Sequence, residues 1–238
     1  MDMDGKVALV TGANRGIGRA LTEALADLGA TVLMVCRDEH AGSRVEEDLR
    51  GRGLDVSLYV ADMASIADIE WLHDDVVEDF EVLDALVNCA AVNLDREETT
   101  VEEMTLDILE TTMAINFFGP FWMCKKFVPL LKRAESGRIV NFTSGLGRLT
   151  VPRMGPYPAY SISKTAVNGL TRVLAAELAG SGVLVNSVDP GWVRTDMGGP
   201  EAPLSVEEGA DTPLWLVTAD ADELESGCLY HNRHVISW

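Results

Sequence analysis

The sequence predicts an α/β fold in which about seven strands form a doubly wound parallel sheet with helices on both faces. Three observations support this prediction. Short apolar or β-branched segments alternate with helical patterns along the whole chain. The strand segments are almost continuously hydrophobic, as expected for strands that are buried on both faces of a parallel sheet. No Pro/Ser-rich linker interrupts the alternation, so we expect residues 1–238 to form one domain.

Each expected strand is a short apolar segment. The strands are expected at residues 6–11, 31–36, 56–61, 84–88, 138–143, 184–188 and 227–231. Helices are expected at residues 17–28, 65–80, 99–131 (broken) and 159–178, and another begins near Val206. Gly29 and Ser65 are typical of a helix end and a helix N-cap. Right-handed crossovers between parallel strands then place helices on both faces of the sheet.

Composition excludes several classes of partner. The chain carries a net charge of −19 and has no basic stripe, so we expect no nucleic-acid partner. No apolar run approaches the roughly 18 residues of a membrane span, and the first residues lack the basic region of a secretory signal. We therefore expect a cytoplasmic protein with a small-molecule substrate. The acidic surface suits either concentrated salt, where repulsion is screened, or an ordinary acidic protein.

The cysteines are expected to be reduced and mostly buried, because they lie far apart in the sequence and three of them stand among apolar residues. They are Cys36, Cys89, Cys124 and Cys228. The spacing of Cys228, His231 and His234 resembles that of zinc ligands. These residues lie in an alternating strand pattern without a fourth ligand, so we expect no metal site.

A glycine-rich turn, TGANRGIG at residues 11–18, joins the first strand to the first helix. Glycines permit a tight turn and a close approach of the backbone to a pyrophosphate, while the helix N-terminus supplies oriented N–H donors. This position in a βα unit makes the turn a candidate dinucleotide site. The candidate cofactor-binding residues in it are Gly12, Asn14, Arg15, Gly16, Ile17 and Gly18.

The end of the second strand indicates which dinucleotide binds. An acidic residue there would hold the ribose hydroxyls of NAD, whereas an arginine favours the 2′-phosphate of NADP. The strand ends at Cys36, and Arg37 and Asp38 follow. Arg15 could supply a second cation to the phosphate. We therefore expect NADP(H), while Asp38 keeps NAD(H) open.

Other candidate site residues also follow strands, where ligands of such sheets bind. Asp62 and Met63 follow the third strand and are placed to contact an adenine. Asn88 ends the fourth strand, and the small side chain of Ala90 permits a close approach to a cofactor. Ser144 presents a hydroxyl after the fifth strand. The sixth is followed by Pro190, Gly191, Val193 and Thr195.

Tyr160 and Lys164 are four positions apart in an expected helix, so their side chains share one face. A free tyrosine has a pKa near ~10, which a nearby ammonium and an oxidised nicotinamide would lower. Tyr160 is therefore the candidate proton donor and acceptor. Tyr157 is the competing candidate, but Pro158 separates it from the helix, and we interpret it as part of the pocket wall.

Together these motifs resemble the short-chain dehydrogenase/reductase family, in its compact, carbonyl-reductase-like form with a Rossmann fold, over essentially the whole chain. The motifs are TGANRGIG, the Asn88 turn, Asn116 in AINFFGP, Ser144, Tyr160 with Lys164, and Pro190-Gly191. One departure is that Asn88-Cys89-Ala90-Ala91 stands where the family has Asn-Asn-Ala-Gly, so a methyl group must fit where the family has glycine.

The resemblance implies a catalytic tetrad of Asn116, Ser144, Tyr160 and Lys164. Tyr160 would protonate the carbonyl oxygen, which Ser144 would hold by a hydrogen bond. Lys164 would bind the nicotinamide ribose and lower the Tyr160 pKa, and Asn116 would position a water molecule. The resemblance further implies that Asn88 and the Val193 backbone seat the nicotinamide and that Thr195 contacts its carboxamide.

The expected function is therefore the NADP(H)-dependent interconversion of a ketone or aldehyde and an alcohol. Two alternatives stay open: an NAD-linked alcohol dehydrogenase of the same family, and a non-catalytic NADP(H)-binding regulator. Family members often pair through their long helices, so the resemblance implies a homodimer or homotetramer.

The expected substrate pocket is lined mainly by apolar side chains, which favour a neutral, bulky carbonyl compound. These are Leu146, Leu149, Val151, Met154, Tyr157, Trp192 and Met197. Arg148, Arg153 and Arg194 provide the alternative of an acidic substrate. The lid is short, since only residues 196–205 separate Thr195 from the next expected helix.

Overall fold

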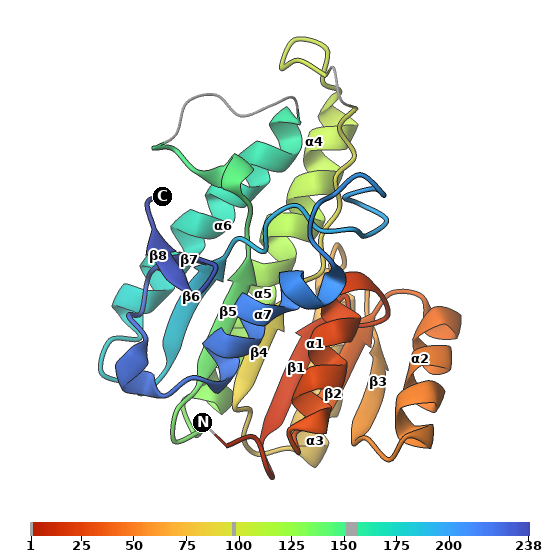
Figure 1. Ribbon diagram of the computed structural model, residues 1–238, viewed down its shortest axis with the longest axis vertical. Helices are drawn as coiled ribbons and strands as arrows, with labels where there is room; N and C mark the ends of the chain where they lie inside the picture. The colour runs from red at the N-terminus through yellow and green to blue at the C-terminus, as the bar shows by residue number, and fades with distance from the viewer. Residues whose placement is uncertain (1, 97–98, 151–156) are drawn as a thin grey trace.

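The computed structural model describes residues 2–96, 99–150 and 157–238, and these residues form one eight-stranded sheet (Figure 1). The strand order is β3-β2-β1-β4-β5-β6-β7-β8. Neighbouring strands from β3 to β7 pair in parallel, and β8 is antiparallel to β7. The prediction of a doubly wound parallel sheet is confirmed, with one strand more than expected.

The strands agree closely with the apolar segments of the sequence. They are β1 (Val7–Thr11), β2 (Thr31–Cys36), β3 (Val56–Val60), β4 (Ala85–Asn88), β5 (Arg138–Phe142), β6 (Leu184–Val188), β7 (Leu229–His231) and β8 (His234–Ile236). The helices are α1 (Gly16–Asp27), α2 (Glu39–Gly51), α3 (Ile66–Asp79), α4 (Leu106–Met113), α5 (Gly119–Leu131), α6 (Pro158–Glu177) and α7 (Val206–Thr218). None of the described helices is long and apolar enough to cross a lipid bilayer.

Two hydrophobic cores lie on opposite faces of the sheet. Ala8 and Val10 of β1 pack with apolar residues of α1, α2 and α7, while Leu9 points to the other face, toward α3, α5 and α6. Figure 1 shows α1 and α7 in front of the sheet and α5 and α6 behind it. This alternation along β1 explains why the strands are apolar at nearly every position.

The long helical pattern at 99–131 differs from the expectation in where it begins and how it breaks. The Thr105 hydroxyl accepts a hydrogen bond from the Ile108 N–H and caps α4, so the helix begins at Leu106. The segment Ala114–Phe118 then forms a π-helical turn before α5. Such turns are frequent at functional sites, and this one contains Asn116.

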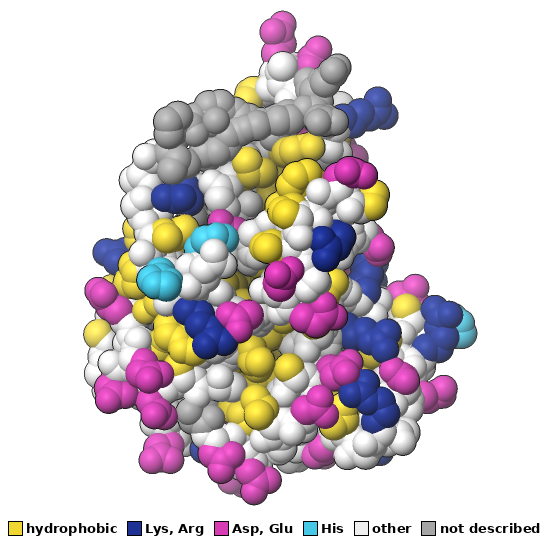
Figure 2. All heavy atoms as spheres, viewed as in Figure 1, with side chains coloured by type: hydrophobic (Ala, Val, Ile, Leu, Met, Phe, Trp, Pro, Cys, Tyr) yellow, Lys and Arg dark blue, Asp and Glu magenta, His cyan; other side chains and the backbone are white. Residues whose placement is uncertain are grey.

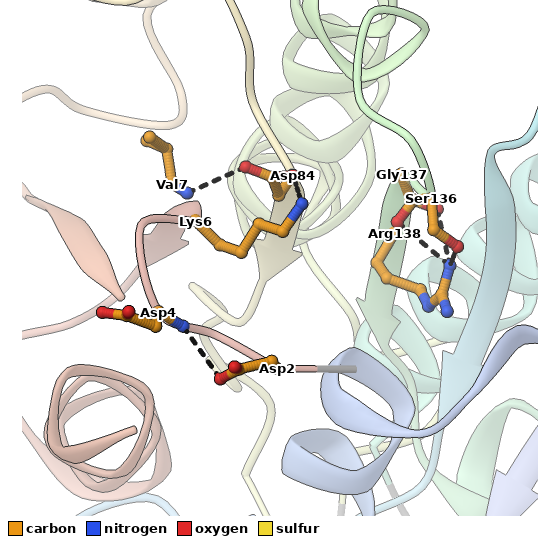
Figure 3. A network of polar contacts seen from close by, with 8 residues as sticks. All are labelled: Asp2, Asp4, Lys6, Val7, Asp84, Ser136, Gly137 and Arg138. Atoms are coloured by element: carbon orange, nitrogen blue, oxygen red, sulfur yellow. Dashed lines mark hydrogen bonds and ion pairs between the residues drawn. The ribbon is translucent and has the colours of Figure 1, made fainter. Parts of the chain in front are cut away.

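Polar contacts hold together the edge of the sheet at which the parallel strands begin (Figure 3). The Asp84 carboxylate accepts a hydrogen bond from the Val7 N–H at 2.9 Å and pairs with Lys6 at 3.4 Å. The buried Arg138 guanidinium donates to the Ser136 hydroxyl at 2.6 Å and to the Ala219 carbonyl at 3.1 Å. These contacts fix the amino edge, and the candidate site residues lie at the opposite edge.

Candidate active site

Tyr160 and Lys164 lie one turn apart on α6, as their spacing predicts. The Lys164 Nζ atom is 5.5 Å from the centroid of the Tyr160 ring and donates a hydrogen bond to the Phe142 carbonyl at 2.8 Å. Lys164 is only 2% exposed, and burial lowers the pKa of its ammonium to about 8. The Lys164 amine is therefore held at the end of β5, beside the phenol.

Burial raises the pKa of Tyr160 well above its ordinary value, and the negative charge of Asp189 raises it further. A hydrogen bond with Ser144 acts in the opposite direction. The lower pKa expected from the sequence requires an oxidised nicotinamide beside the phenol as well as the Lys164 ammonium. Loss of water around the phenol outweighs the hydrogen bond with Ser144, so these protein groups hold Tyr160 in its protonated form.

Ser144 lies directly after β5, where the chain turns into a short 3₁₀ helix. Its hydroxyl accepts a hydrogen bond from the Leu146 N–H at 3.2 Å and also contacts the Tyr160 hydroxyl. The end of β5 and the first turn of α6 therefore bring together two of the expected catalytic side chains with Lys164.

Asn116 lies deeper than these residues and is 1% exposed. Its amide accepts a hydrogen bond from the Val92 N–H and donates one to the Val92 carbonyl, both at 2.8 Å. It also donates to the Ser163 hydroxyl at 3.0 Å. The Asn116 side chain thus joins the segment after β4 to α6, a set of contacts that the sequence did not indicate.

The glycine turn has the geometry that a dinucleotide needs. Gly12 and Gly16 have φ angles of +69° and +53°, and a Cβ atom on Gly12 would lie 3.0 Å from the Ala90 Cα. Arg15 is the N-cap of α1, and its side chain makes no capping hydrogen bond. The N-terminus of α1 therefore has backbone donors without a side-chain cap, so these residues fit a pyrophosphate.

Thr11 supports this turn, although sequence reasoning gave it no role. Its hydroxyl accepts hydrogen bonds from the Cys89 and Ala90 N–H groups, both at 3.0 Å. It thereby ties the end of β1 to the segment that follows β4. No local pattern could have indicated this contact, since 78 or more residues separate the partners.

The two residues that follow β2, Arg37 and Asp38, differ in how far their side chains are engaged by the protein. The Asp38 carboxylate accepts a hydrogen bond from the Ala41 N–H at 2.9 Å and caps α2. The Arg37 side chain is 71% exposed, and its nearest ion-pair contact is a long one, 3.8 Å from Asp62. Arg15 pairs with Asp196 at 2.6 Å. Arg37 is therefore the more available of the two candidate phosphate ligands.

Asn88 and Met63 are both buried at the edge of the sheet where the parallel strands end. The buried Asn88 amide donates to the Asn141 side chain at 2.8 Å, which joins β4 to β5. The Met63 backbone packs closely on Gly119 of α5, since a Cβ atom there would lie 2.8 Å from the Met63 carbonyl oxygen. Their side chains support the edge of the sheet.

After β6 the chain folds back on itself over residues 190–204. Val193 is buried and pairs with Leu204, and the Trp192 indole donates to the Gly198 carbonyl at 2.8 Å. The Thr195 hydroxyl accepts a hydrogen bond from the Gly198 N–H at 3.1 Å. A Cβ atom on Gly16 would lie 3.2 Å from the Thr195 methyl group, so this segment rests against the glycine turn.

The sheet order and the glycine turn define a doubly wound protein of the dinucleotide-binding class. A family model described as short chain dehydrogenase matches residues 6–203. The chain belongs to the short-chain dehydrogenase family.

Relatives match over the whole chain. Carbonyl reductase [NADPH] 1 of Oryctolagus cuniculus is 33% identical, with 100% of both chains covered. (+)-Neomenthol dehydrogenase of Arabidopsis thaliana is 32% identical, with 97% of both chains covered. Among solved structures, NADPH-bound carbonyl reductase from chicken fatty liver superposes with a TM-score of 0.86 at 27% identity, covering 99% of this chain and 100% of the other.

Proposed function

We propose that this protein is an NADP(H)-dependent oxidoreductase that interconverts a ketone or aldehyde and an alcohol, with Tyr160 as its general acid and base. The observation that carries the proposal is the group formed by the half-buried Tyr160 and Ser144 and the buried Lys164 at the carboxyl edge of the sheet. The carbonyl reductase relatives and the NADPH-bound structural neighbour support the cofactor and the reaction class.

The cofactor would bind across the carboxyl edge of the sheet. The N-terminus of α1 would hold its pyrophosphate, since the donors there lack a side-chain cap. Arg37 would bind the 2′-phosphate through charge-assisted hydrogen bonds. Because Asp38 caps α2, its carboxylate is less available to the ribose hydroxyls of NAD. This favours NADP(H) over the NAD-linked alternative.

When bound, NADPH supplies a hydride to the carbonyl carbon. The Tyr160 hydroxyl would give its proton to the carbonyl oxygen as negative charge develops there. Ser144, which contacts the same hydroxyl, would hold the oxygen in place by a hydrogen bond. The Lys164 ammonium would bind the nicotinamide ribose and offset charge on Tyr160, and Asn116 would hold the segment after β4 against α6.

The substrate is proposed to be neutral and fairly bulky. The Arg148 guanidinium donates to Ser237 at 2.8 and 2.9 Å, and that of Arg194 donates to the Ala202 and Pro203 carbonyls at 3.0 and 2.7 Å. Both cations are thus occupied by the protein's own oxygen atoms. Three apolar side chains of the expected wall, those of Leu149, Trp192 and Met197, are exposed. Two further wall residues, Val151 and Met154, and the third candidate arginine, Arg153, lie outside the described residues.

The direct test is a panel of ketones and aldehydes offered to the purified protein with NADPH and, separately, with NADH. We expect NADPH consumption with neutral carbonyl compounds and a lower kcat/KM for matched compounds that carry a carboxylate. Faster turnover with NADH would support the NAD-linked alternative. Tight NADPH binding without turnover of any compound would support the non-catalytic regulator.

We also propose that residues 1–238 form a single domain, since all the described strands join one sheet. A homodimer or homotetramer is proposed through α5 and α6, which border a groove of about 520 Å³. Phe118, Phe121 and Val173 are exposed on or beside these helices. Sedimentation of the purified protein would test this. The four free cysteines fit a cytoplasmic location.

A further inference from the structure

The helix that carries Tyr160 is not capped by the side chain of its own N-cap residue. Its N-cap residue is Tyr157, which has left-handed backbone angles of φ 91° and ψ 57° and no side-chain capping bond. Pro158 follows and has no N–H group. Tyr160 is the third residue of α6, so its N–H has no partner within the helix.

Asp95 supplies the missing cap from another part of the chain. Its Oδ2 atom accepts a hydrogen bond from the Tyr160 N–H at 2.8 Å across a separation of 65 residues. A carboxylate at the N-terminus of a helix is also favoured by the helix dipole. The hydrogen bond thus holds the backbone of the residue whose hydroxyl is proposed to transfer the proton.

The segment that carries Asp95 is itself attached to the rest of the site. The Thr11 hydroxyl binds its first residues, Cys89 and Ala90. Asn116 binds both backbone groups of Val92. Asp95 therefore links Tyr160 to a segment that is already fixed against the glycine turn and the π-helical turn.

We propose that Asp95 is a positioning residue that fixes the first turn of α6, and with it the Tyr160 hydroxyl, relative to Ser144. The inference rests on the proposed function. Its action is geometric, because the carboxylate whose charge acts on the Tyr160 phenol is that of Asp189.

Two substitutions separate the hydrogen bond from the charge. Asp95→Asn keeps an oxygen that can accept from the Tyr160 N–H, and asparagine is a good N-cap. Asp95→Ala removes the acceptor. Thr105→Ala is the matched control, because it removes a side-chain cap from the neighbouring helix α4, which carries none of the proposed catalytic residues.

We expect Asp95→Ala to lower kcat by about tenfold or more, since small misplacements of reacting groups are costly, with little change in the KM for NADPH. Asp95→Asn should keep kcat within about threefold and leave the pH profile of kcat unchanged. Thr105→Ala should lose stability without losing kcat. Equal losses of kcat in Asp95→Asn and Asp95→Ala, or full activity in Asp95→Ala, would overturn the inference.

Hydrogen exchange provides a readout that does not depend on turnover. Exchange at the first turn of α6 should be faster in Asp95→Ala than in the wild-type protein and should return to the wild-type rate in Asp95→Asn. If the wild-type protein reduced no carbonyl compound, the proposed function would fail while this measurement still decided whether Asp95 fixes the turn. Unchanged exchange in Asp95→Ala would contradict the positioning role.

Discussion

Individual residues around Tyr160 shift the pKa of its phenol in opposite directions. Burial and the charge of Asp189 both favour the protonated phenol, whereas the Ser144 hydroxyl favours the phenolate. The Asp189 carboxylate is fixed by the Gly191 N–H, which donates to it at 3.0 Å, and lies 3.8 Å from the His231 ring nitrogen. A protonated phenol suits carbonyl reduction, because the reductive direction consumes a proton.

Asp189→Asn should therefore lower the Tyr160 pKa by removing a negative charge, while the amide oxygen can still accept from the Gly191 N–H. Alcohol oxidation needs the phenolate and should begin at lower pH than in the wild-type protein. Carbonyl reduction should decline at lower pH for the same reason. Profiles of kcat against pH in both directions test this, and a shift to higher pH would contradict it.

Arg37→Ala should raise the KM for NADPH by about tenfold or more, because a charge-assisted hydrogen bond to the 2′-phosphate is lost. The KM for NADH should change less than about twofold, since NADH lacks that phosphate. Arg15→Ala is the control: Arg15 already pairs with Asp196, so its loss should have a smaller effect. Equal changes in the KM values for NADPH and NADH would show that Arg37 does not bind the 2′-phosphate.

The candidate site depends on the close approach of two segments, the turn between β1 and α1 and the segment after β4. Gly12 makes this approach possible, because a side chain there would contact Ala90. Gly5 has nearly the same φ angle, +68° against +69°, but among the described residues no heavy atom beyond its immediate chain neighbours lies within 4 Å of the position of its Cβ. An alanine at either position would be strained by its positive φ angle, but only an alanine at Gly12 would also contact a neighbouring segment.

Gly5→Ala should destabilise the protein by about 1–2 kcal/mol, the usual cost of a left-handed alanine. Gly12→Ala should lose more stability and also weaken NADPH binding by about tenfold or more, since the turn must move away from Ala90. Thermal unfolding and cofactor titration measure the two effects. Equal losses in both variants, with NADPH binding intact, would show that the close approach is unimportant.

Sequence patterns predicted the elements whose periodicity is strong and missed those that depend on distant contacts. The apolar strands and α6 lie close to where they were expected. The hairpin between β7 and β8 was missed because Asn232 and Arg233 both have positive φ angles without a glycine. Arg233 instead forms an ion pair with Asp211 and donates its backbone N–H to Thr212 at 3.2 Å.

The same distinction applies to the site. The spacing of Tyr160 and Lys164 is a local helical pattern, so the sequence alone predicts that their side chains are neighbours. The contacts of Thr11, Val92 and Asp95 join segments that are distant in the chain and involve common polar or backbone groups. The raised pKa of Tyr160 also depends on burial, which only the packed structure provides.

The whole molecule is strongly acidic, and Figure 2 shows acidic side chains spread widely over the visible face. Several of the basic side chains already pair with carboxylates, as in Arg19–Asp48, Arg52–Glu23 and Arg233–Asp211. The net charge of −19 therefore leaves an excess of unpaired negative charge that repels itself.

We expect the Tm and the activity to rise or hold as KCl approaches about 1 M, because salt at that concentration screens charges beyond about 3 Å. The exposed ion pairs that salt also weakens contribute little, at most about 1 kcal/mol each. KCl is preferable to sulfate, which stabilises proteins by exclusion from their surface. A Tm that falls steadily with added KCl would favour the interpretation as an ordinary acidic protein.

Proton transfer by the Tyr160 hydroxyl can be tested by comparing Tyr160→Phe with Tyr157→Phe. Removing only the Tyr160 hydroxyl should lower kcat by about a hundredfold or more, the usual contribution of a positioned acid, and leave the Kd for NADPH nearly unchanged. Tyr157→Phe should keep most of the activity. An inactive Tyr157→Phe variant beside an active Tyr160→Phe variant would contradict the assignment.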